Sequence, residues 1–116
     1  MKKLFLVLVA LFLLTGVCFA GQGFNPSVVT SSGQVKASGG TVYYAYITFK
    51  GATVGDTAKV VDSLTSSGTA YIYVTARTAN DFIVVPIPPL GIQYGTGIYD
   101  VITISGGSAQ VTLLYY

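Results

Sequence analysis

Residues 41–50 read TVYYAYITFK, and this stretch decides the fold class. Eight of its ten residues are β-branched or aromatic, which predicts a long β-strand. Alternation along a strand places Tyr43, Ala45, Ile47 and Phe49 on one side, and Val42, Tyr44, Tyr46 and Thr48 on the other. A strand with one face in water normally carries charged or small polar side chains on that face. Because tyrosines occupy both sides here, we expect another surface to cover the tyrosine-bearing outer face.

The segments around this strand repeat its composition. Short apolar runs separated by turn residues occupy residues 57–62, 69–76, 81–87, 91–94, 97–105 and 109–116. No segment after residue 20 keeps a helical period, and the turns recur about every eight to twelve residues, a spacing typical of sandwiches and barrels. We therefore predict an all-β protein, a small antiparallel β-sandwich of jelly-roll or immunoglobulin-like type with about 7–8 strands.

The first twenty residues, MKKLFLVLVALFLLTGVCFA, have the order of a secretion signal. Two lysines precede an apolar run, and a small residue, Ala20, closes it. A transmembrane helix is the alternative, but the run is at the short limit for a bilayer. Lipid attachment at Cys18 is disfavoured because the bulky Val17 precedes it. We expect residues 1–20 to be a cleaved signal peptide, 21–40 a Gly/Ser-rich N-terminal arm or edge strand, and 41–116 the sandwich domain.

Charge narrows the classes of partner. The whole chain has a net charge of +2, and Lys2 and Lys3 account for all of it. The remaining four basic residues balance four aspartates, so the expected mature chain is neutral. It has no basic patch for nucleic acid and no net self-repulsion, and neutral proteins associate readily. After signal cleavage we expect no membrane contact.

The residue types disfavour an enzyme. The chain contains no histidine and no glutamate, and its one cysteine is Cys18. A Ser-His-Asp triad and a zinc site of histidine or cysteine are therefore excluded after residue 20. Asp56, Asp62 and Asp81 lie at predicted turns, where a carboxylate caps the local backbone. Asp100 lies in a predicted strand, at a bulge or a paired edge position. We expect no catalytic residue, no cofactor and no metal site.

Two later stretches carry a recognisable pattern. In VVDSLTSSGTAYI (60–72), a strand ends in Asp62 and Gly68 follows six residues later. In PPLGIQYGTGIYDVITISGGSAQVTLLYY (88–116), the positions that carry the pattern are Pro89, Gly91, Tyr94, Gly97, Tyr99, Gly106, Gly107 and Tyr115. Over roughly residues 41–116 the chain resembles small phage-type virion proteins. The resemblance implies a compact β-sandwich with a structural role as a virion decoration or tail-associated protein, without catalysis.

The leader favours use of such a sandwich outside the cell, because virion proteins assemble in the cytoplasm. We expect a secreted, non-enzymatic structural protein that assembles with itself or docks on a surface or virion protein, as in a fibre, filament or surface layer. Edge-strand pairing and tyrosine-rich faces would join the copies. The expected interface residues are Tyr44, Tyr46, Tyr71, Tyr73, Val111, Leu113, Tyr115 and Tyr116. The expected structural turn residues are Asp62, Gly68, Gly97, Gly106 and Gly107.

Two other functions compete with this one. The first is a phage virion protein, decoration or tail-associated, as the resemblance implies. The second is a carbohydrate-binding module that uses surface tyrosines and a turn aspartate.

Overall fold

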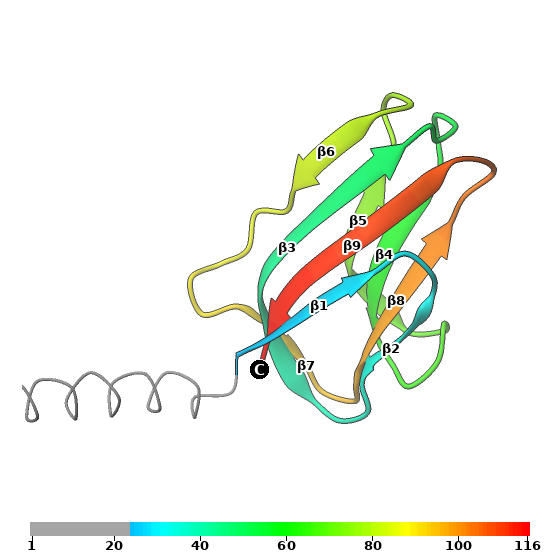
Figure 1. Cartoon of the computed structure of the whole chain (residues 1–116). Helices are drawn as coiled ribbons and strands as arrows, with labels where there is room; N and C mark the ends of the chain where they lie inside the picture. Colours follow the sequence, from blue (N-terminus) through cyan, green and yellow to red (C-terminus); the bar gives the residue numbers. More distant parts are fainter. Residues whose placement is uncertain (1–23) are drawn as a thin grey trace, which may run out of the picture.

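The computed structural model describes residues 24–116, so the predicted signal peptide and residues 21–23 lie outside the described residues. The described chain is all-β, with two antiparallel sheets packed face to face as a small sandwich (Figure 1). No helix among these residues could cross a membrane. The strands are β1 (Asn25–Val29), β2 (Gly33–Lys36), β3 (Gly40–Lys50), β4 (Thr57–Asp62), β5 (Thr69–Thr75), β6 (Asp81–Val84), β7 (Ile92–Tyr94), β8 (Ile98–Thr103) and β9 (Ser108–Tyr115).

The prediction of an all-β sandwich is therefore confirmed, with nine strands where about 7–8 were expected. The additional strands come from the Gly/Ser-rich segment, which contributes β1 and β2. These two strands form an edge of each sheet, β1 beside β9 and β2 beside β8.

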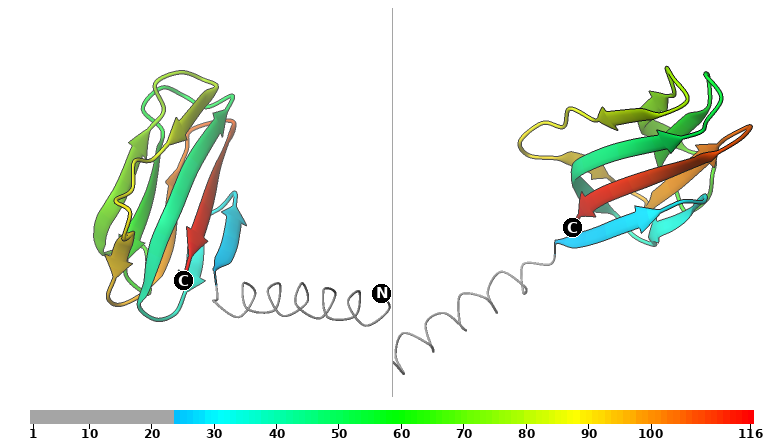
Figure 2. Two further views of the ribbon diagram at one scale, coloured as in Figure 1. Left: turned by 90° about the vertical axis from the view of Figure 1, so that its left-hand side faces the viewer. Right: turned by 45° about the horizontal axis from the view of Figure 1, so that its top comes forward.

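Strand order divides the chain between the two layers. The five-stranded sheet has the order β1-β9-β3-β6, and β7 pairs with the first residues of β3. The four-stranded sheet has the order β2-β8-β4-β5. Figure 2 shows the two layers in side view, with β8 and β9 in different sheets. The Gly106–Gly107 turn therefore connects the two layers of the sandwich.

A bulge in β3 changes the predicted alternation. Val42 pairs with Tyr115 and Tyr44 with Leu114, so Tyr43 is an extra residue opposite the regular ladder of β9. An extra residue turns the side chains before it to the other face. Val42 is therefore fully buried and Tyr43 is exposed, the reverse of the predicted sides for these two residues. From Tyr44 to Phe49 the predicted alternation is correct.

The core lies between the sheets and consists of alternate residues of the longer strands. Phe49, Ile47 and Ala45 of β3 face Ile72 of β5 and Val60 of β4, and all five are at most 1% exposed. Tyr94 is also buried, and its hydroxyl donates a 3.3 Å hydrogen bond to the carbonyl oxygen of Val60. This bond joins β7 of one sheet to β4 of the other, and it satisfies the one polar atom of a large core side chain.

Candidate interaction surface

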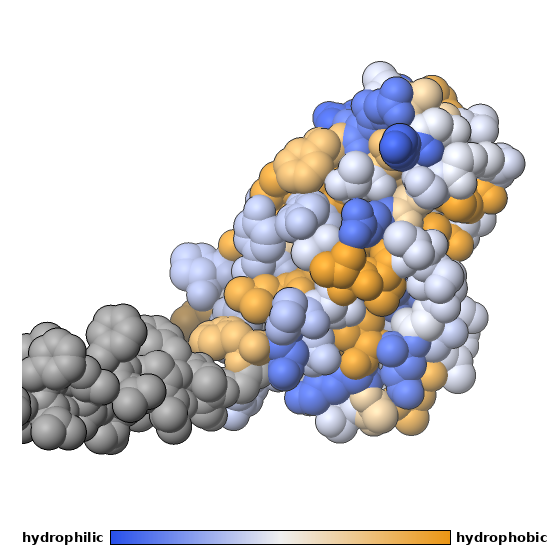
Figure 3. All heavy atoms as spheres, viewed as in Figure 1, coloured by the Kyte–Doolittle hydropathy of each residue, from blue (hydrophilic) through white to orange (hydrophobic). Residues whose placement is uncertain are grey.

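The outer side of the five-stranded sheet carries an uncharged surface of aromatic and aliphatic side chains. It comes from four neighbouring strands whose register aligns Pro26, Val28, Tyr44, Tyr46, Phe82, Val84, Thr112 and Leu114, with the polar, uncharged Thr48 and Gln110 beside Phe82 on the same side. We call the first eight of these residues the aromatic face. Figure 3 views this side of the molecule and shows orange, hydrophobic groups interspersed with paler and blue, hydrophilic ones.

Three rings form a continuous row on this face. The ring centroids of Tyr44 and Tyr46 lie 5.8 Å apart, and those of Tyr46 and Phe82 lie 5.3 Å apart. Such edge-on and tilted arrangements are favourable for aromatic pairs and fix the rings in place. Phe82 is nevertheless 58% exposed, and Tyr44 is 44% exposed. Two of the predicted interface tyrosines, Tyr44 and Tyr46, therefore belong to one surface.

The other two predicted tyrosines lie on the four-stranded sheet and differ from each other. Tyr73 points outward from β5, and the ammonium group of Lys59 lies 5.1 Å from the centre of its ring. Tyr71 sits at a register shift between β4 and β5, and its ring packs edge-on against buried Tyr94 at 5.3 Å. Tyr71 therefore packs against a core ring and is still 49% exposed, while Tyr73 is 58% exposed, so both tyrosines are accessible on this sheet.

The closing strand is an interior strand, contrary to its predicted role as an assembly edge. β9 lies between β1 and β3 and pairs with both. Val111 and Leu113 are core residues, 0% and 1% exposed, because their side chains point between the sheets. Both are therefore removed from the candidate interface.

The last two tyrosines serve the fold in part. The hydroxyl of Tyr115 donates to the carbonyl oxygen of Val35 at 3.5 Å. Tyr116 exchanges two backbone hydrogen bonds with Thr41, at 2.8 and 3.0 Å, and its ring lies against that of Phe24. The Tyr116 ring is still 55% exposed, at the end of the sheet that holds β7.

Asp62 organises one end of the sandwich. Its carboxylate accepts hydrogen bonds from the backbone N–H groups of Gly95, Thr96 and Gly97, at 3.0, 2.7 and 3.2 Å. These bonds hold the β7–β8 loop against the end of β4, and they lower the pKa of Asp62. Gly68 and Gly97 lie nearby, where a side chain would meet the backbone of the 62–63 segment. The structure thus places Asp62, Gly68 and Gly97, the predicted turn residues, together at this end of the sandwich.

Two more aspartates hold the loops at the opposite end. Burial alone would raise the pKa of Asp56, but hydrogen bonds from Thr53 and Ser105 outweigh it, and the pKa is lowered. Asp81 accepts two side-chain hydrogen bonds from Arg77, at 2.9 and 3.0 Å, and these lower its pKa to about 2. These carboxylates are therefore engaged in loop structure. In residues 24–116 no three acidic, histidine or cysteine side chains gather into a metal-binding group.

Asp100 is the polar residue whose environment differs from the one that the sequence predicts. It lies in β8, an interior strand, and is fully buried, so neither a bulge nor an edge position describes it. Neither carboxyl oxygen has a hydrogen-bond partner, and burial raises its pKa to about 7. The alternation of Ile98, Asp100 and Ile102 was the available signal, because it places all three on the inner face of one strand.

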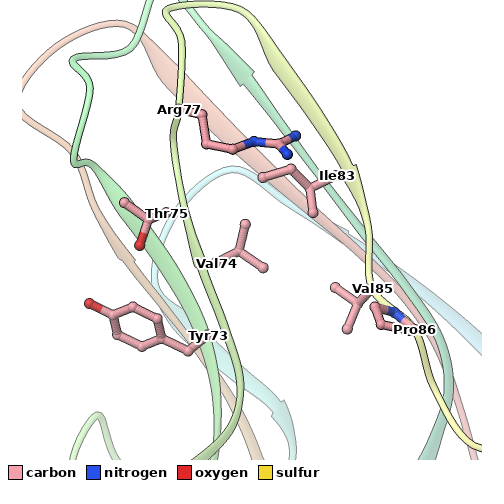
Figure 4. A pocket seen from close by; sticks show the side chains of 7 residues that line it. All are labelled: Tyr73, Val74, Thr75, Arg77, Ile83, Val85 and Pro86. Atoms are coloured by element: carbon pink, nitrogen blue, oxygen red, sulfur yellow. The ribbon is translucent and has the colours of Figure 1, made fainter.

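A groove runs along the open side of the sandwich, between edge strands β5 and β6. Its volume is about 290 Å³, and its lining residues are Tyr73, Val74, Thr75, Arg77, Ile83, Val85 and Pro86. Figure 4 shows Val74 of one sheet pointing toward Val85 and Ile83 of the other. These three apolar side chains form the floor. Sequence alone could not identify the groove, because it depends on which strands end as edges.

Comparisons with known proteins found no match: no family model, no curated protein and no solved structure corresponds to this chain. The resemblance to phage-type virion proteins therefore stays a prediction.

Proposed function

We propose that this protein is an exported, non-enzymatic structural protein that associates with itself through the aromatic face. The observation that carries the proposal is the composition of that face: eight side chains from four strands, with no charged group among them. Lys50, the charged residue of β3, lies at the far end of that strand. A strand face that contacts only water normally carries charged or small polar side chains.

The exposed aromatic area is large enough for a specific association of moderate strength. Taking about 200 Å² for a whole aromatic side chain, the exposed parts of Tyr44 and Phe82 amount to roughly 200 Å² in each copy. Covering them in both copies stabilises the pair by about 10 kcal/mol at 25 cal/mol per Å². Association costs about 4–15 kcal/mol in lost freedom. The half-exposed valines Val28 and Val84 add further area, so the balance favours binding.

A second copy is the partner that the charges favour. Between residues 24 and 116 four basic residues balance four aspartates, so identical copies do not repel each other. An uncharged, apolar surface is complementary to another of the same kind, and two such sheets can pack face to face about 10 Å apart. A partner with a charged surface would lose hydration on this face without gaining an ion pair.

The proposal is tested by replacing Tyr44 and Phe82 with serine together and measuring mass by light scattering after gel filtration. Both side chains are exposed, so the fold should persist while the large species disappear. The matched control is Val54→Ser with Leu90→Ser, which removes two exposed apolar side chains outside the face. Unchanged association in the first variant would contradict the proposal.

Export is the second part of the proposal and rests on residues 1–20. The N-terminus of the exported protein should be Gly21. Retention of Met1 would contradict it.

A further inference from the structure

The four-stranded sheet has one long, uncharged edge strand whose last residues are open to pairing with another chain. Natural edge strands are usually short, or carry proline, lysine or a bulge. β1 contains Pro26, and β6 and β7 span only four and three residues. β2 has four residues, a register shift and Lys36 at its end.

β5 differs from these strands. It spans seven residues, from Thr69 to Thr75, and contains no proline and no charged residue. Its one irregularity is the register shift at Tyr71, so the ladder from Ile72 to Thr75 is regular. β5 pairs with β4 on one side and with no described strand on the other. Its outer backbone groups are therefore available to a new strand.

The groove described above lies directly beside this edge. Its floor residues Ile83 and Val85 are only partly buried, and Val74, on β5 itself, completes the floor. Pro86 stands on the opposite rim and cannot donate a backbone hydrogen bond. A strand that arrives here can therefore pair with β5, while its own neighbours cover the apolar floor.

We propose that β5 pairs antiparallel with β5 of a second copy, about a two-fold axis through Tyr73. This inference extends the self-association proposed above to a second contact, and it rests on that function for its biological use. Pairing about Tyr73 sets Ile72 opposite Val74 of the second copy, within the regular part of the strand, and brings the grooves of the two copies together. Because β5 carries no aspartate, glutamate, lysine or arginine, no like charges meet across the axis.

Two different two-fold contacts give each copy two neighbours. The aromatic face joins one neighbour through the five-stranded sheet, and β5 joins the other through the four-stranded sheet. The copies therefore form a row in which face and edge contacts alternate, and the angle between the two axes decides whether the row closes into a ring.

The test is Tyr73→Glu, which places two carboxylates opposite each other across the axis. Within one copy the new glutamate lies beside Lys59, its cross-strand neighbour, so the fold should be retained. Val101→Glu is the matched control, because Val101 is the neighbour of Lys59 on the other side, in interior strand β8. Both variants add the same charge next to the same lysine, and only the first alters the edge.

We expect Tyr73→Glu to weaken the edge contact at least tenfold and to leave face-paired dimers, while Val101→Glu keeps the larger species. Tyr44→Ser with Phe82→Ser should leave edge-paired dimers, and the three substitutions together should give monomers. If Tyr73→Glu sediments like Val101→Glu, the edge proposal is overturned and the aromatic face stands. If the face variant alone keeps the larger species, the proposed function falls and the edge contact stands.

A cysteine at the axis tests the register directly. In the exported chain from Gly21, which has no other cysteine, Tyr73→Cys places two sulfhydryl groups on directly opposite residues, at a Cα separation that a disulfide accepts. Mild oxidation should give a covalent dimer, and Ser66→Cys, on an exposed loop, should give none under the same conditions. Cross-linking of Tyr73→Cys to a different protein, or equal cross-linking of both variants, would overturn the proposed pairing.

Discussion

Tyr94 reaches across the interior to Val60, and its hydroxyl donates a 3.3 Å hydrogen bond to the Val60 carbonyl oxygen. The two residues belong to different sheets, so this buried bond ties the short strand β7 to the opposite layer. Burial raises the pKa of the Tyr94 hydroxyl, with the nearby Asp100 carboxyl adding to the effect, so the hydroxyl stays protonated as a donor.

Removing the Tyr94 hydroxyl should lower the stability of the sandwich without unfolding it. We expect Tyr94→Phe to lower the free energy of unfolding by about 1 kcal/mol, because the ring keeps its packing and one hydrogen bond is lost. Urea denaturation measures the change. Tyr115→Phe removes a longer, less buried bond and should cost less. The Tyr115 bond also joins the two sheets, so an equal loss in both variants would contradict the greater contribution expected from the buried Tyr94 bond.

Asp100 predicts an unusual dependence of stability on pH. Its pKa is about 7 in the folded protein and 3.8 in an unfolded chain. Between these values the folded state holds a proton that the unfolded state has released. The free energy of unfolding should therefore fall as pH rises from about 4 to about 7, by up to about 4 kcal/mol, and then level off. In Asp100→Asn the free energy of unfolding should no longer fall over this pH range.

The other three aspartates should make the free energy of unfolding fall as the pH is lowered. The pKa values of Asp56, Asp62 and Asp81 are lowered in the fold, so their stabilisation is complete above the unfolded value of 3.8. It is lost as pH falls through the folded values. Stability should therefore be greatest near pH 4–5, as measured by denaturation across the pH range. A plateau from there to pH 8 in the unmodified protein would contradict the burial of an ionisable Asp100.

Asp62 should control the order of the loop that it binds. Asp62→Ala leaves the N–H groups of Gly95, Thr96 and Gly97 without their acceptor, so amide hydrogen exchange at these residues should rise. Asp62→Asn keeps one acceptor oxygen and should show a smaller rise. Unchanged protection in the alanine variant would mean that other contacts hold the loop.

The two glycines of the closing turn should respond differently to alanine. Gly107 has a φ of +66°, and a Cβ there would collide with the backbone of Lys50 and Gly51. Gly107→Ala should therefore cost about 1–3 kcal/mol. Gly106 has ordinary backbone angles, and its nearest neighbour is the Thr53 hydroxyl at 3.8 Å, so Gly106→Ala should be nearly neutral. Thermal melts compare the two variants. Equal melting temperatures would contradict the conclusion that Gly107, and not Gly106, needs a glycine.

Composition and alternation were sufficient to predict the fold class and the positions of seven strands. They failed at Val42 and Tyr43 because a bulge depends on the partner strand, and β9 is not recognisable as that partner from sequence. They also failed at Val111 and Leu113. An apolar closing strand has the same composition whether it lies at an edge or, as here, between β1 and β3.

The interaction surface was predictable only where its residues lie on one strand. Tyr44 and Tyr46 share a strand, so alternation placed them together. Phe82 and Val84 join them only through the pairing of β3 with β6, a long-range contact that no local pattern encodes. Tyr71 and Tyr73 alternate regularly in the sequence, yet a register shift turns Tyr71 toward Tyr94.

Sedimentation velocity of the exported protein over a wide concentration range tests the central claim most directly. We predict that the sedimentation coefficient rises with concentration, and that Tyr44→Ser with Phe82→Ser reduces this rise. A single boundary of monomer mass at every concentration up to the solubility limit would contradict association through the aromatic face.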